Sequence, residues 1–221
     1  MGLPFDYRKT NPPLLSTNPS LLPDTPLQCP TLLSLLRAPV LACSVTINAS
    51  TTSAPMQQDL NDTHYMKLAL QQAEQAPQVG EVPIGAVLVH RNEVIAVGHN
   101  YREHLQDPTA HAEMIVIRNA AEQLQTWRLT DTTLYVTLEP CPMCAGAIVQ
   151  ARIARLVFGA WDPKAGACGS IIDIPAERRF NHRVQVTGGL LEQKSRTLLQ
   201  DFFQAKRGNT SGGPRPPDSA L

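Results

Sequence analysis

The chain has 221 residues, 43% of them hydrophobic, and its 19 basic side chains balance 19 acidic ones. That length suits one domain with a hydrophobic core plus some extra chain, and the hydrophobic fraction excludes a chain that is disordered throughout. No apolar run is long enough to cross a bilayer, and five scattered cysteines favour free or metal-bound thiols in a reducing compartment over a disulfide framework.

Residues 1–55 differ in composition from the rest of the chain. They hold nine prolines and many serines and threonines, with Asp6 and Asp24 as the only acids, and such a stretch cannot easily bury a core. Three interpretations compete: a transit-type leader, a secretory leader over the apolar run 31–45, or a natural start at Met56. We favour the start at Met56, which predicts a cytoplasmic protein, whereas a transit peptide would predict an organellar one. The secretory leader ranks last because a charge and a proline interrupt its run.

Residues 56–207 are predicted to form the folded domain, and residues 208–221, rich in Gly, Pro and Ser, a flexible tail. Hydrophobic spacing, with capping and turn residues between segments, places the elements. In chain order we expect a helix over 65–76 with its N-cap at 61–63, a hairpin of strands over 84–89 and 94–97, a helix started by residues 107–109 and running to 121, a strand over 132–137, a helix from 141 or 142 to 150, strands over 155–158 and 184–186, and a helix over 190–206. Because helices alternate with strands after an opening hairpin, the pattern predicts a layered α/β domain with a mixed five-stranded sheet.

Two short motifs carry residues suited to chemistry: HAE at 111–113 and PCPMC at 140–144, each at an expected helix start. A helix N-terminus favours the thiolate, the metal-binding form of cysteine, and Cys141 and Cys144 lie on one face of one turn. If the two helix starts face each other, His111 and the two sulfurs converge as ligands suited to zinc. Three ligands leave one position open, as in catalytic zinc sites, and Glu113 is then placed to contact water there rather than the metal.

Each motif alone has a plainer interpretation. A single C-x-x-C is more often a redox pair or half of a structural zinc site, and a single H-x-E has little meaning. Together, in this order and with proline before the first cysteine, they match the H-x-E…P-C-x-x-C signature of zinc deaminases. Cys168 could supply a fourth ligand, but it lies in a glycine-rich segment without partner spacing, so we interpret it as a small packing residue.

The signature predicts hydrolytic removal of an exocyclic amino group from a nucleobase. Zinc lowers the pKa of bound water to about 7, and the resulting hydroxide attacks C6 of adenine or C4 of cytosine. We expect Glu113 to be the proton shuttle, which moves the water proton to the neighbouring ring nitrogen and then assists the departure of ammonia.

Matches extend beyond the metal motifs, and residues 57–207 resemble the bacterial tRNA-specific adenosine deaminases of the cytidine deaminase-like zinc deaminase superfamily. The matching stretches are EVPIGAV at 81–87, DPTAHAE at 107–113, LYVTLEPCPMCAGA at 134–147, VFGA at 157–160, NHRV at 181–184 and DFF at 201–203. The DPTA lead-in and the DFF point to the tRNA branch. The resemblance implies a three-layer α/β/α cytidine deaminase-like fold and a homodimer with one Zn2+ per subunit on His111, Cys141 and Cys144. It further implies conversion of adenosine to inosine at wobble position 34, in the anticodon loop of an arginine tRNA.

The resemblance also implies substrate contacts. Asn100 matches a residue that contacts the target nucleotide, although a turn residue after the second strand is the plainer interpretation. Pro83 and Ile84 match positions that line the base pocket, and they would equally serve as ordinary residues at the start of a strand.

Charge placement supports RNA as the partner. Only Glu192 and Asp201 oppose the basic residues between 178 and 207, which are Arg178, Arg179, Arg183, Lys194, Arg196, Lys206 and Arg207. Such residues would contact phosphate. Tyr101, Phe202 and Phe203 could stack on bases, although the two phenylalanines would equally serve as core.

Two other functions compete with this one. A small-molecule deaminase acting on free cytosine, cytidine, dCMP or guanine would share the metal site without needing a basic surface. A zinc-stabilised RNA-binding module without catalysis is disfavoured, because a purely structural site has no use for Glu113.

Overall fold

The computed structural model describes residues 54–208, so the predictions for residues 1–55 and for the tail 208–221 lie outside the described residues apart from the shared ends. The elements are α1 Ala54–Gln75, the 3-10 helix η2 Ala76–Val79, β1 Gly85–His90, β2 Glu93–His99, α2 Arg102–Leu105, α3 Ala112–Gln123, β3 Thr132–Leu138, α4 Pro142–Gln150, β4 Arg155–Ala160, β5 Gln185–Thr187 and α5 Glu192–Gly208. Every predicted strand is confirmed to within two residues. None of the helices in this part of the chain is long and apolar enough to span a membrane.

The strands form one five-stranded sheet in the order β2-β1-β3-β4-β5. β1 pairs antiparallel with β2 and β3, whereas β3 pairs with β4, and β4 with β5, in parallel. The sheet is therefore mixed, as predicted. The register pairs Leu138 with Ala160, so β3 and β4 end at the same edge of the sheet. In layered α/β domains this carboxyl edge is where ligands commonly bind.

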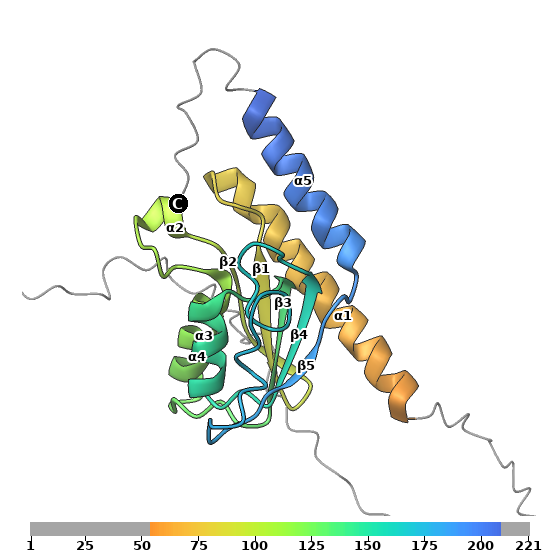
Figure 1. The fold of residues 1–221 in the computed structure, drawn as a ribbon, viewed down its shortest axis with the longest axis vertical. Coiled ribbons are helices and arrows are strands. Elements are labelled where there is room, and N and C mark those ends of the chain that lie inside the picture. Colours follow the sequence, from red (N-terminus) through yellow and green to blue (C-terminus); the bar gives the residue numbers. More distant parts are fainter. Residues whose placement is uncertain (1–53, 209–221) are drawn as a thin grey trace, which may run out of the picture. The chain divides into compact units, whose positions relative to one another are not determined.

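Helices cover both faces of the sheet, with α3 and α4 on one face and α1 and α5 on the other (Figure 1). Because side chains alternate along a strand, neighbouring residues enter different cores. Leu134 belongs to the core that includes Val116 of α3, whereas Tyr135 belongs to the core that includes Met66 of α1. These two cores confirm the three-layer α/β/α fold.

Helix α1 begins earlier than the sequence pattern predicts. The predicted N-cap at Asn61-Asp62-Thr63 is wrong, because the helix already runs from Ala54. The Asp62 carboxylate accepts hydrogen bonds from the side chains of Tyr135 and Arg155. The local pattern assigned the Asp62 carboxylate to capping the helix, but this group instead binds side chains of the sheet.

The prediction that Asp107-Pro108-Thr109 starts a helix is also wrong. Asp107 Oδ1 accepts hydrogen bonds from the backbone N–H and the hydroxyl of Thr109 at 2.7 and 2.6 Å, which closes a turn. Helix α3 begins only at Ala112, and the short helix α2 before the turn has no counterpart among the predicted elements.

Candidate metal centre

His111, Cys141 and Cys144 come together at the starts of two helices. His111 is the N-cap of α3 and Cys141 the N-cap of α4, both with extended backbone, and Cys144 lies in the first turn of α4. His111 Nδ1 lies 3.7 Å from Cys141 Sγ and 3.6 Å from Cys144 Sγ. The three side-chain ligand atoms all lie within 4.8 Å of one another, so the structure brings the predicted ligands together.

This donor set fits a zinc ion. In a tetrahedral site with Zn–S near 2.3 Å and Zn–N near 2.0 Å, sulfur and nitrogen ligands lie roughly 3.5 Å apart. The observed separations of 3.7 and 3.6 Å agree with that value. Within residues 54–208, no fourth His, Cys, Asp or Glu joins the group, as expected for a site with three protein ligands.

The Cys141 sulfur is predisposed to ionise. A hydrogen bond from Cys144 lowers the pKa of Cys141 to about 4; burial opposes this shift, and a hydrogen bond with His111 adds to it. For Cys144, the same sulfur–sulfur hydrogen bond and complete burial raise the pKa. The pair therefore offers a thiolate at neutral pH, which is the form that binds metals.

Glu113 lies in the first turn of α3 beside this group without being part of it. Its side chain is 4% exposed, and burial raises the pKa of Glu113 to about 6. The charge of Glu113 is also among the causes that raise the pKa of Cys144, so the carboxylate lies near that sulfur. A buried carboxyl group beside three candidate metal ligands is suited to proton transfer.

Asn100 and Ile84 lie next to the helix start that carries His111. Asn100 is buried; its Oδ1 accepts a hydrogen bond from Ala112 N at 2.9 Å, and its backbone N–H donates to Ile84 O at 3.1 Å. Asn100 therefore caps α3, and no residue in the described part of the chain pairs with its Nδ2. Pro83 is buried, and the half-buried Ile84 packs on the core under α3. The three predicted substrate positions thus share one edge of the sheet with the metal group.

Other residues singled out from the sequence take different places. Cys168 is 4% exposed in the hydrophobic core and lies outside the metal group. Tyr101 is half-buried with its ring stacked on His99 at 4.6 Å between centroids. The sequence analysis did not single out Glu139, which is buried. A charged residue between an apolar strand and Cys141 was the feature that could have indicated it.

The predicted basic region is partly neutralised. Arg179 pairs with Glu177 at 2.8 Å, and Arg196 pairs with Glu192. Glu177 lies one residue before the span in which the basic residues were counted, so the local excess is smaller than predicted. Phe203 is 43% exposed and packs edge to face on Phe202, so the core interpretation fails for Phe203.

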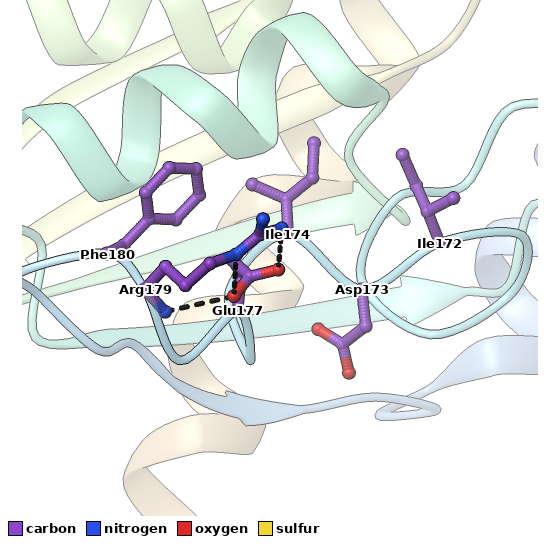
Figure 2. A pocket seen from close by; sticks show the side chains of 6 residues that line it. All are labelled: Ile172, Asp173, Ile174, Glu177, Arg179 and Phe180. Carbon is purple, nitrogen blue, oxygen red and sulfur yellow. Dashed lines mark hydrogen bonds and ion pairs between the residues drawn. The ribbon is translucent and has the colours of Figure 1, made fainter.

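A cavity of about 660 Å³ lies on the segment after β4, lined by Ile172, Asp173, Ile174, Glu177, Arg179 and Phe180 (Figure 2). Figure 2 shows the Arg179 guanidinium against the Glu177 carboxylate, with Asp173 set apart from this pair. Arg179 is one of the predicted phosphate contacts, but none of the lining residues is a predicted metal ligand or base-pocket residue, so this cavity does not mark the metal centre.

A family model described as MafB19-like deaminase matches residues 60–207. The chain is 53% identical over 146 residues to a tRNA-specific adenosine deaminase of Bacillus subtilis, covering 66% of this chain and 91% of that protein. It is 48% identical over 147 residues to the tRNA-specific adenosine deaminase of Haemophilus influenzae, covering 66% and 85%. It is 46% identical over 161 residues to the chloroplastic tRNA(adenine(34)) deaminase of Arabidopsis thaliana, covering 66% of this chain and 12% of that much longer protein.

Solved structures give the same picture. A structure from studies of A-to-I editing by tRNA:A34 deaminases matches with a TM-score of 0.60 and 50% identity, covering 62% of this chain and 99% of that one. A guanine deaminase from Nitrosomonas europaea matches with a TM-score of 0.55 and 24% identity, covering 63% and 83%. The second likeness shows the shared fold alone.

Proposed function

Because this chain belongs to the tRNA-specific adenosine deaminases, within the deaminase family whose model spans residues 60–207, we propose that it converts adenosine to inosine at wobble position 34 of an arginine tRNA. The observation that carries the proposal is the convergence of His111, Cys141 and Cys144 with Glu113 beside them. In the overall reaction, water replaces the C6 amino group, which leaves as ammonia.

Three side chains are proposed to hold one Zn2+ per subunit: His111 through Nδ1, and Cys141 and Cys144 through their sulfurs. Bound zinc lowers the pKa of water and so supplies a nucleophile at neutral pH. The chain prepares the ligands, because the N-terminal ends of α3 and α4 stabilise negative charge on the sulfurs. The extended backbone at both N-cap positions directs the ligands toward each other.

Glu113 is proposed to carry the protons of the reaction. Its carboxylate takes a proton from the attacking water, delivers it to N1 of adenine, and then assists protonation of the departing amino nitrogen. The Glu113 side chain is 4% exposed, so its carboxyl group lies away from bulk water. One carboxyl group can serve both transfers because it lies beside the metal group.

The target base is proposed to enter against Asn100, Pro83 and Ile84. Since Oδ1 of Asn100 is occupied by Ala112 N–H, the side chain presents Nδ2 as a donor to an acceptor of the target nucleotide. Pro83 and Ile84 supply an apolar wall for the ring. The hydrogen-bonding edge of adenine and the apolar face of its ring are the features that such a pocket recognises.

The anticodon loop of tRNA is the proposed partner, bound by a homodimer. The target base must leave the stack to reach a pocket at the sheet edge. The remaining basic residues of the C-terminal region, such as Arg183 and Lys194, supply phosphate contacts, so binding should weaken as salt rises. Analytical ultracentrifugation tests the dimer, and binding at several salt concentrations tests the phosphate contacts.

The test is conversion of a defined tRNA. Purified, zinc-loaded protein is incubated with an arginine tRNA that carries adenosine at position 34, and the product is sequenced for inosine. The same tRNA with guanosine at position 34 controls for site selectivity, and Glu113→Gln controls for a contaminating enzyme. We expect inosine at position 34 only, and only with the unchanged protein.

Free bases and nucleosides separate this function from the small-molecule alternative. Cytosine, cytidine, dCMP and guanine are assayed for ammonia release with the same preparation. Ammonia from one of these without inosine in any tRNA would replace the proposed function with small-molecule deamination. A zinc-loaded protein inactive on every substrate would favour a non-catalytic binding module.

A further inference from the structure

The Glu139 side chain, two residues before Cys141, is buried at 2% exposure and accepts four hydrogen bonds. Its Oε1 accepts from the backbone N–H groups of Cys168 and Ser170 at 2.9 and 3.0 Å. Its Oε2 accepts from the backbone N–H of Asp162 at 3.0 Å and from the Ser170 hydroxyl. This carboxylate is therefore saturated by donors that all belong to one loop.

That loop, residues 162–170, folds closely around the carboxylate. A Cβ on Gly166 would lie 2.2 Å from Oε2 of Glu139, so only glycine fits there without a shift. The loop is thus organised around the two acceptor oxygens of Glu139.

The same loop contacts the segment 139–141, which leads into the start of α4. Ala167 N–H donates to Pro140 O at 2.9 Å, and Pro140 immediately precedes Cys141. Cys168 is buried in the core shared with α3 and α4. The loop and the segment 139–141 are thus joined twice. The Glu139 carboxylate accepts hydrogen bonds from the loop, and Ala167 of the loop donates one to Pro140, next to Cys141.

We propose that Glu139 is a positioning residue. By binding the loop 162–170, its carboxylate holds the segment 139–141 in place and so positions the metal-binding sulfur of Cys141. Its consequence for catalysis rests on the proposed function, whereas its consequence for metal retention does not depend on the substrate. In Glu139→Gln, an NH2 group would replace one acceptor oxygen and face N–H or O–H donors. At least one of the four donors would then lose its partner.

The experiment compares zinc-loaded wild type, Glu139→Gln, Ser170→Ala and the matched control Glu177→Gln. Glu177 also accepts a backbone N–H, from Arg179, but lies outside the loop 162–170. Zinc release to a chromogenic chelator is timed, and kcat and KM on tRNA are measured separately. We expect Glu139→Gln to release zinc about 10- to 100-fold faster and to lose a similar factor in kcat. The KM should change little, and Glu177→Gln should match wild type.

A folded Glu139→Gln protein whose zinc release and kcat match wild type would overturn the proposal, even if its unfolding temperature fell. If Glu139→Gln does not fold, Ser170→Ala decides, because it removes one donor and leaves three. We expect its zinc release to be faster by roughly 3-fold or more, in line with one lost hydrogen bond, and unchanged release would overturn the proposal. A wild-type protein that holds zinc but makes no inosine would refute the proposed function, while the release rates would still test Glu139.

Discussion

Arg155, the first residue of β4, forms a bidentate ion pair with Asp62 of α1. Nη1 lies 2.7 Å from Oδ1 and Nη2 lies 2.6 Å from Oδ2, and the two side chains are only 15% and 6% exposed. The hydroxyl of Tyr135 donates to the same Oδ1 at 2.7 Å. This largely buried ion pair ties helix α1 to the sheet.

Removing the Asp62 charge should destabilise the protein strongly. In Asp62→Ala, Arg155 would be left largely buried, with only its 3.4 Å contact to Thr187 Oγ1 remaining, and the loss of one member of a buried pair costs up to about 3–5 kcal/mol. Urea unfolding followed by circular dichroism measures the change. Asp59→Ala, on an exposed position of the same helix, should cost less than about 1 kcal/mol. Equal effects of the two substitutions would contradict the role of the ion pair.

The same pair should make stability fall in acid. Burial raises the pKa of Asp62, but hydrogen bonds from Arg155 and Tyr135 outweigh it, so this pKa lies below its ordinary value. A carboxyl group with a lowered pKa in the folded state stabilises above its unfolded pKa, about 3.9 for Asp, and that contribution disappears as pH falls through the folded pKa. The stability difference between wild type and Asp62→Asn should therefore be full at pH 6 and shrink below about pH 4. A difference that stays constant down to pH 2 would exclude this linkage.

Asp62 also shows where sequence patterns fail. An Asn-Asp-Thr run before a helical pattern predicts an N-cap from local spacing alone, yet the partners of Asp62 are Tyr135 and Arg155, on strands far along the chain. The prediction of a helix start at Asp107 was wrong for the opposite reason, because the partner of Asp107 is local. Its hydrogen bond from Thr109 closes a separate turn before the helix.

The metal group was predictable because its geometry is mostly local. Cys141 and Cys144 share one helical turn, and the signature supplied His111. The positions of the strands along the chain followed from hydrophobic runs between turn residues, whereas their order in the sheet came only from the structure. The role of Glu139 could not be predicted, because its hydrogen-bond donors lie 23–31 residues later, in a loop without a regular pattern.

Glu113→Gln should keep the metal and lose the reaction. Glutamine has nearly the same volume and fills the same buried position, but it cannot take a proton from water. The loss of a general acid–base group lowers kcat by about 100- to 10,000-fold. Elemental analysis should still find one zinc per chain. A variant with wild-type turnover would remove Glu113 from the mechanism.

Cys168→Ala should leave zinc binding intact. Cys168 is buried in the core and stands outside the group formed by His111, Cys141 and Cys144. We expect one zinc per chain and a stability loss of about 1 kcal/mol from the lost packing. Cys141→Ala, the matched control, should lose most of its zinc after dialysis against a chelator. Zinc loss from Cys168→Ala as severe as from Cys141→Ala would contradict the interpretation of Cys168 as a packing residue.

Gly85→Ala should destabilise the contact between β1 and α1. A Cβ on Gly85 would lie 2.1 Å from Ala69 O and 2.4 Å from Ala73 N, and both are backbone atoms of α1. Neither can turn aside as a side chain would, so the helix or the strand must move, at about 1–3 kcal/mol or more.

Gly146→Ala in α4 is the control for this prediction, because nothing lies within 4 Å of the added carbon. It should be neutral or stabilising by up to about 1 kcal/mol, through better helix propensity. Urea midpoints of both variants and the wild type give the comparison. If Gly85→Ala were as stable as Gly146→Ala, helix α1 could not lie as close to β1 as the structure places it. Since the Gly85 N–H also donates to Thr137 Oγ1 at 3.1 Å, a displaced β1 should disturb the end of β3 that leads to the metal centre.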